Sequence, residues 1–352
     1  MAIGLHDTLN KEFSRLHDHD DFHLPDHQSD QPYGGYDAIL QRVEEASKVC
    51  CALVATLAYW GNETSDQWWI DELERFSTHA RGGGLAKQLK LRLVAGSALY
   101  YSAGVSALSA RRYDLLARLL DARRPSPHRN ELELLAVALD ADAAYSESSG
   151  HGTRISPLVR PLLRESLAIS DGALDDAWQR FEIIRLAKGV MGNARFDARL
   201  ASFKEMDAAL AGAQKRFEEA EQVGLGVDNA RQERVEASHN RGRAMGAIAD
   251  AVPLGRPHIL SVDLRGDDHY RSPVAERLAN GIAAEGDTHP LVKAQLAADP
   301  TALSIAISAV SVAVGRRGDK LAWGRLPSGG GIVPMEIWLD TGQTPDELAL
   351  KT

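Results

Sequence analysis

Hydrophobic residues recur at steps of three and four along most of the chain, with polar residues between them. This spacing places the hydrophobic side chains on one face of an α-helix, which must then be buried against a neighbouring element. The clearest example covers residues 36–60 and is followed by Gly61 and Asn62, which favour a helix end. Its stripe consists of Tyr36, Ile39, Leu40, Val43, Val49, Cys50, Leu53, Val54 and Leu57.

A second helix is expected to begin near Ser65 or Asp66. Either side chain can accept a hydrogen bond from the first helical turn and so act as an N-cap. The segment Gly82–Gly84 is expected to form a flexible break after this helix. Its inward-facing residues are Trp69, Leu73 and Phe76.

A pair of helices should follow, joined by a tight corner at Arg111–Tyr113. The first covers residues 85–110 and is rich in small residues, and the second carries closely spaced leucines. This arrangement looks like a tetratricopeptide-style helix hairpin, but no period of about 34 residues repeats it. We therefore expect irregular antiparallel helix pairs and not a regular solenoid. The leucines are Leu115, Leu116, Leu119 and Leu120.

Composition and hydrophobic pattern divide the chain into three parts. Residues 1–35 form a polar, His- and Asp-rich N-terminal arm, with room for a short helix near Leu9–Leu16. Residues 36–252 are expected to form a helical domain, and residues 253–352 a small mixed α/β or helical portion. The fold class predicted is therefore mainly α. The later helices of the middle part are expected over residues 130–147, 157–168, 172–190, 195–222 and 228–249.

The C-terminal portion begins with a strand signal, since the short segment 258–264 is rich in Ile, Leu and Val and lies between breakers. Ser272–Pro273 then predicts a helix that ends near residue 284. Asp299–Pro300 predicts another over residues 300–314, although its alternating pattern also fits a strand. Residues 323–339 are expected to hold two short strands.

Composition supports helix packing and argues against several functions. Of the 352 residues, 44% are hydrophobic but only 6% are aromatic, which suits helices better than a β-sandwich. The net charge of −9 disfavours general binding to nucleic acid. The adjacent Cys50 and Cys51 indicate reduced thiols, because neighbouring residues cannot readily form a disulfide.

The N-terminus has no basic region followed by an apolar core, so no signal peptide is expected there, and one uncharged stretch, Leu93–Ala110, reaches the minimum length of a membrane span. Its many glycines and serines dilute the hydrophobicity, so a buried central helix is the preferred interpretation. We expect a cytoplasmic protein with no membrane segment.

A histidine-rich run in the N-terminal arm is the strongest candidate for chemistry. His17, His19, Asp21 and His23 are residue types that bind catalytic zinc or iron. The spacing resembles the first motif of metallo-β-lactamase-like hydrolases, but Phe22 stands where that motif has its last histidine. A metal-dependent hydrolase with a divalent cation is therefore an alternative, the other interpretation being a solvated tail. No other cofactor is predicted.

A second candidate is the one locally basic region. Arg111, Arg112, Arg123 and Arg124 flank the fourth helix and could bind a nucleotide, a nucleic acid or an acidic partner. The competing interpretation is a solvated corner in which arginines stabilise helix ends. Neither a phosphate loop nor a nucleophile motif accompanies them, so we lean against an enzyme.

Four segments in this order resemble a known kind of protein region: Trp69–Phe76, Leu91–Gly104, Arg112–Leu120 and Trp178–Glu182. Over residues 36–190 the chain is similar to the helical C-terminal region of large bacterial proteins. Their N-terminal parts are P-loop NTPase, sirtuin-like or Schlafen AlbA-type domains, and many are suspected of antiphage defence. Here only the His-rich arm precedes the region, so the resemblance implies a sensing or scaffolding part without its effector.

These patterns lead to a non-enzymatic helical interaction or regulatory module, expected to bind a protein partner or a second copy of itself. The concave side of the helix pairs is the expected surface, and the resemblance suggests a role in antiphage defence. The expected core residues are Leu53, Leu73, Tyr100, Leu116, Leu119 and Phe181.

Overall fold

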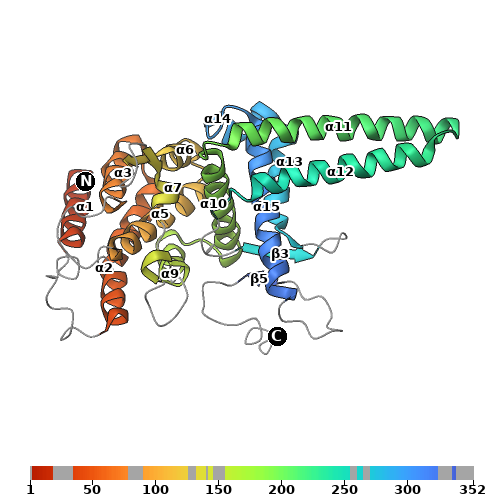
Figure 1. Cartoon of the computed structure of the whole chain (residues 1–352). Helices are drawn as coiled ribbons and strands as arrows, with labels where there is room; N and C mark the ends of the chain where they lie inside the picture. Colours follow the sequence, from red (N-terminus) through yellow and green to blue (C-terminus); the bar gives the residue numbers. More distant parts are fainter. Residues whose placement is uncertain are drawn as a thin grey trace.

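The computed structural model describes residues 2–18, 35–77, 90–125, 132–139, 142–145, 155–253, 260–264, 270–323 and 335–337. Helices dominate these residues, as Figure 1 shows, which confirms the mainly α prediction. The longer helices are α1 (Ala2–His17), α2 (Tyr36–Trp60), α3 (Glu63–Ser77), α5 (Leu91–Ser109), α6 (Tyr113–Asp121), α9 (Ile155–Leu167), α10 (Asp171–Met191), α11 (Phe196–Val223), α12 (Val227–Ala249), α13 (Pro273–Glu285) and α15 (Pro300–Trp323). The shorter elements are β1 (Arg123–Pro125), β2 (Leu132–Leu134), α7 (Leu135–Ala138), α8 (Asp142–Tyr145), β3 (Leu260–Leu264), β4 (Tyr270–Arg271), a 3₁₀ turn (Gly286–Thr288), α14 (Pro290–Lys293) and β5 (Met335–Ile337).

Helix α5 is the centre of the body and contacts α2, α3, α9 and α10. Its small residues allow this close packing. A Cβ atom at Gly104 would lie 2.7 Å from Cδ2 of Phe181 on α10, and nearer still to two other ring atoms. The uncharged stretch is thus a buried helix, as predicted. Within the described ranges no helix is long and apolar enough to cross a membrane.

The N-terminal arm is more structured than expected. Helix α1 packs on α2 and α3 and buries Leu9, Phe13 and Leu16. These three residues lie at steps of four and three, which gives one apolar face. The remainder of the arm, residues 19–34, lies outside the described residues.

Several helix boundaries differ from the sequence predictions. Helix α3 is capped by Asn62, whose Oδ1 accepts from the Ser65 N–H at 3.2 Å, while the Ser65 hydroxyl accepts from the Asn62 N–H at 2.8 Å. Ser65 and Asp66 therefore lie inside the first turn. The helix predicted over residues 130–147 is wrong, because β2 pairs there with β1 in antiparallel register and only short helical turns follow.

The C-terminal portion joins the same core. Helices α13 and α15 pack on α10, and the buried apolar cluster continues across residue 253 without a break. The expected strand is present as β3, which lies between β4 and β5, antiparallel to both. Ser272 caps α13 as predicted, accepting from the Ala275 N–H at 3.3 Å. Helix α15 continues to residue 323, so the predicted end at Gly315 is wrong.

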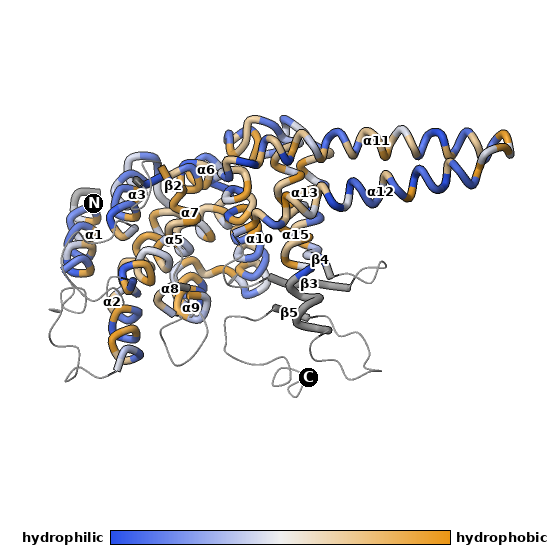
Figure 2. Tube along the Cα trace, viewed as in Figure 1, coloured by the Kyte–Doolittle hydropathy of each residue, from blue (hydrophilic) through white to orange (hydrophobic). Residues whose placement is uncertain are grey.

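Most predicted core residues are buried. Figure 2 shows hydrophobic residues concentrated where the helices of the body face one another. Leu53 is only partly buried, and Val49, which the sequence placed on the apolar stripe of α2, is 47% exposed, so that assignment is wrong. The fully or almost fully buried residues among those predicted are Leu73, Tyr100, Leu116, Leu119 and Phe181.

Candidate interaction surface on the helical hairpin

Helices α11 and α12 form a long antiparallel pair that projects away from the body (Figure 1). We call residues 196–249 the helical hairpin. Its base is joined to the body by two ion pairs, Lys204 to Asp299 at 3.1 Å and Arg316 to Asp250 at 2.9 Å. Among the described residues, the side-chain hydrogen bonds and ion pairs of residues 205–241 join only residues of the hairpin itself.

The sequence explains why two helices pair here. Positions at alternating steps of three and four form a seam on each helix, as in a two-stranded coiled coil. Gly224 and Gly226 have φ values of 72° and 70°, a left-handed conformation that glycine adopts without strain and that reverses the chain. The seam positions are Phe203, Met206, Leu210, Ala213 and Phe217 on α11, and Ala230, Arg234, Ala237, Arg241 and Ala244 on α12.

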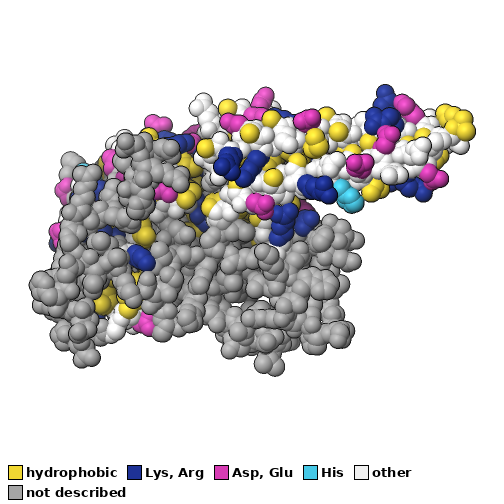
Figure 3. Space-filling view, viewed as in Figure 1, with side chains coloured by type: hydrophobic (Ala, Val, Ile, Leu, Met, Phe, Trp, Pro, Cys, Tyr) yellow, Lys and Arg dark blue, Asp and Glu magenta, His cyan; other side chains and the backbone are white. Residues whose placement is uncertain are grey.

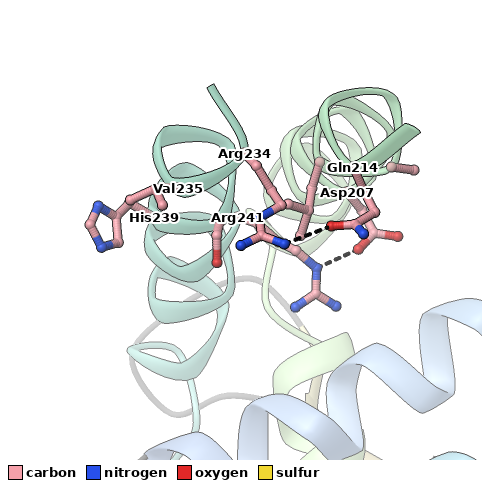
Figure 4. Close-up of a pocket in the computed structure, with 9 residues that line it drawn as sticks. Asp207, Gln214, Arg234, Val235, His239 and Arg241 are labelled. Carbon is pink, nitrogen blue, oxygen red and sulfur yellow. Dashed lines mark hydrogen bonds and ion pairs between the residues drawn. The ribbon is translucent and has the colours of Figure 1, made fainter. Parts of the chain in front are cut away.

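Two arginines occupy seam positions that are usually hydrophobic. The guanidinium carbon of Arg234 lies 4.3 Å from the centre of the Phe217 ring, and that of Arg241 lies 5.0 Å from the centre of the Phe203 ring. Such contacts stabilise a partly exposed pair by about 0.5–1 kcal/mol each. Figure 4 shows both arginines reaching across to α11, where Arg241 pairs with Asp207. The seam is therefore held together by polar as well as apolar contacts.

A shallow groove of about 710 Å³ lies along one face of the hairpin, around these arginines. Leu210, Ala211 and Ser238 contribute to its lining, together with the exposed Val235. The groove forms because side chains such as Ala211 and Ser238, at the middle of the hairpin, are too short to fill the space between the two helices. Because apolar and polar groups alternate along it, the groove suits a protein surface better than a small apolar ligand.

The tip of the hairpin is hydrophobic and fully open. Val223 is 69% exposed and Leu225 is 74% exposed, and Figure 2 shows hydrophobic colour gathered at this outer end. With Val235 they are three of the seven large hydrophobic side chains exposed among the described residues. A sharp turn between two left-handed glycines places Leu225 at the apex.

The four predicted arginines do not converge on one exposed site. Arg112 donates to the Leu57 and Ala58 carbonyls at the end of α2, at 3.0 and 2.9 Å, and to Asp66 at 2.7 Å. Arg124 is buried against Glu133 at 3.1 Å. Arg111 and Arg123 are exposed. Half of the cluster therefore stabilises the fold, and binding through the others stays a prediction.

The predicted metal ligands lie mostly outside the described residues, since His19, Asp21 and His23 belong to residues 19–34. His17 is described: its Nε2 lies 2.8 Å from Oε2 of Glu72 and its ring stacks on Phe76 at 4.1 Å. Among the described residues no group of three or more His, Cys, Asp or Glu side chains is placed to hold a metal ion.

Buried ionisable groups in the body are engaged in structural contacts. Glu182 accepts from Tyr101 and pairs with Arg185 at 2.6 Å, and Glu44 accepts from Tyr145 at 2.9 Å. Both cysteines are free and buried, and burial raises the pKa of each thiol to about 12. A thiol with that pKa is protonated at neutral pH and a poor nucleophile, which agrees with the prediction that Cys50 is a core residue.

No known protein family, curated protein or solved structure matches this chain. The hairpin is therefore interpreted from its own residues. Sequence reasoning found its two helices but not their pairing. The signal was present in the alternating steps of three and four on both sides of Gly224–Gly226.

Proposed function

We propose that this chain is a non-enzymatic interaction protein and that the helical hairpin is its binding element. The observation that carries the proposal is a long hairpin that leaves the body, with leucine and valine exposed at its tip. The binding surface thus differs from the concave side of the helix pairs that the sequence suggested.

The energetics of the hairpin support this role. Few of its residues are buried, and arginines replace apolar residues in its seam, so its own packing contributes little stability. Exposed hydrophobic side chains gain free energy when a partner covers them, at about 25 cal/mol per Å² of apolar surface. A polar shaft with an apolar tip is suited to reversible protein binding.

A matched pair of substitutions tests the proposal. Leu225 at the tip and Leu132 on the body are both strongly exposed, at 74% and 62%. Tagged wild-type, Leu225→Ser and Leu132→Ser chains would be recovered from the native host and their bound proteins quantified. Leu225→Ser should recover at least about tenfold less partner protein than the wild type, because a tip leucine is the expected anchor. Leu132→Ser should recover as much partner as the wild type.

A variant without the outer hairpin provides the control. Replacing residues 207–241 by a short Gly/Ser linker keeps Lys204, Asp250 and their ion pairs to the body. This variant should keep the body folded, as judged by circular dichroism and melting temperature, and should recover no partner. Undiminished partner recovery by this variant would overturn the proposal.

The resemblance over residues 36–190 adds a biological setting to the proposal: a sensing or scaffolding role in bacterial antiphage defence. Plaque counts on hosts carrying wild-type or Leu225→Ser chains test it. Protection that depends on the tip leucine supports the setting, and equal plaque counts with and without the chain contradict it.

A further inference from the structure

We infer that the partner of the hairpin is a second copy of this chain, with the two hairpins antiparallel and each tip seated on the base of the other. This inference rests on the proposed function and identifies its partner. It is carried by the opposite chemistry of the two ends of the hairpin.

The tip combines hydrophobic residues with several carboxylates. Residues 217–230 contain four carboxylates and no lysine or arginine. At their centre lie the exposed Val223 and Leu225. The carboxylates are Glu218, Glu219, Glu221 and Asp228. Glu219 and Asp228 pair with the flanking Lys215 and Arg231, at 3.8 and 3.9 Å. Glu218 and Glu221 make no ion pair among the described residues, and carboxylates of this kind repel nucleic acid and anionic lipid and attract a basic protein surface.

The base of the hairpin has the complementary properties. Residues 195–204 and 241–249 carry five lysines and arginines and a single carboxylate, Asp197. Lys204 and Arg241 are paired with Asp299 and Asp207. The other three, Arg195, Arg199 and Arg243, make no ion pair among the described residues. Figure 3 shows Lys and Arg side chains at several places along the hairpin, its base included, and hydrophobic side chains at its outermost end.

A groove at the base of the hairpin is the site where the tip of the second copy would bind. It has a volume of about 300 Å³ and is lined by Ala198, Ala244 and Ala247, with Arg195 and Arg199 as its charged members. Nη1 of Arg199 is buried and has no hydrogen-bond acceptor among the described residues. Alanines provide an apolar surface for Leu225, and the guanidinium groups would face the tip carboxylates.

A two-fold axis between the two copies pairs the tip and the base of each hairpin at the same time. If the tip of one copy lies on the base of the other, the reverse contact follows by symmetry. At about 1.5 Å per residue, Arg199 and Leu225 are roughly 39 Å apart along the hairpin, so the two hairpins would overlap over this length. The stripe that includes Ala198 and Ser202 passes Glu205 and continues through Ala209 and Gly212 at mid-length, where small residues allow close approach.

Charge reversal with rescue tests the inference on the full-length chain. Light scattering after gel filtration, at about 1 to 100 µM protein, should give a mass approaching twice 38.2 kDa as concentration rises. Tip reversal (Glu218→Lys with Glu221→Lys) and base reversal (Arg195→Glu with Arg243→Glu) should each weaken dimerisation about tenfold or more. An equimolar mixture of the two variants should restore pairing, because in the mixed dimer each tip meets a base of opposite charge.

Two controls make the outcomes decisive. Glu45→Lys with Glu165→Lys changes exposed charges on the body and should leave the dimer intact, and circular dichroism checks that every variant is folded. A monomer at all concentrations, or a dimer insensitive to both reversals, overturns the inference. If the chain stays monomeric while Leu225→Ser still loses a partner from the host, only the identity of the partner is refuted and the proposed function stands.

Discussion

Asp66 shows how a single buried carboxylate organises the arginines near the α5–α6 corner. It is fully buried and accepts from both Arg112 and Arg118 at 2.7 Å. Burial raises the pKa of this carboxyl despite the two guanidinium groups, which act to lower it. The arginine pattern that suggested a binding site is therefore in part a structural ion-pair network.

Removing this carboxylate should destabilise the body. Asp66→Ala leaves two guanidinium groups without their shared partner, one of them only 20% exposed, and should lower the free energy of unfolding by about 3 kcal/mol. Glu165→Ala, at an exposed position on α9 of the body, is the control and should change it by less than about 0.5 kcal/mol. Equal urea midpoints for the two variants would show that the ion-pair network around Asp66 does not stabilise the body.

Asp299 makes a pH-dependent contribution to the free energy of unfolding. Although burial acts to raise the pKa of its carboxyl, hydrogen bonds from Lys204 and from the Thr301 N–H prevail and lower it. A lowered pKa in the folded state stabilises the protein above the ordinary value near 4 and loses this effect as pH falls through the lowered value. Asp299→Ala should therefore cost about 1 kcal/mol at pH 7 and clearly less at pH 2. A cost independent of pH would contradict this assignment.

Individual residues were predictable from sequence only where spacing decides their burial. Leu116 and Phe181 were predicted to be in the core and are buried, because their helices are covered on the predicted face. Val49 was predicted on the same kind of stripe and is 47% exposed. The position of neighbours is a tertiary property that spacing along one helix does not contain.

At the level of elements, α5 and α10 depend on a glycine for their close approach. Alanine normally stabilises a helix interior by about 1 kcal/mol relative to glycine. At Gly104 the added Cβ would overlap the Phe181 ring, which is held between Tyr100 and Tyr101 at 5.6 and 5.4 Å. Gly104→Ala should therefore lower the melting temperature, with an overpacking cost of about 1–3 kcal/mol.

The control for this substitution is Gly172→Ala. Gly172 also lies in a helix, but a Cβ there meets nothing within 4 Å, so the change should be neutral or slightly stabilising. A Gly104→Ala chain that melts at or above the wild-type temperature would show that the two helices are less tightly packed than described.

The sequence predicted several helix ends correctly but not the pairing between distant segments. Local signals at Ser272 and at Gly224–Gly226 marked true boundaries. The segment around residues 130–147 was predicted as helix because its leucines and alanines have high helix propensity. Pairing of β2 with β1 overrides that propensity, and such pairing between segments is not visible in a short window.

At the scale of the whole molecule, the sequence predicted packed helices and a boundary at residue 253, and the buried apolar cluster contains described residues from both sides of that boundary. It placed protein binding on the concave side of the helix pairs, with the arginine corner and the His-rich arm as candidate sites. The two helices of the hairpin were predicted, but not the hairpin itself, because the spacing along one helix does not name the helix it packs on. Its seam is marked by Arg234 and Arg241, which a search for hydrophobic stripes passes over.

The central claim is that the tip of the hairpin meets another protein chain, and crosslinking in the native host tests it most directly. A photoreactive amino acid would be placed at position 225 on the tip, and at the exposed position 165 on α9 as control. The proposed function predicts one dominant crosslinked protein from position 225, which the further inference identifies as a second copy of this chain, and none from position 165. Absence of any crosslink from position 225, or the same products from both positions, would contradict the claim.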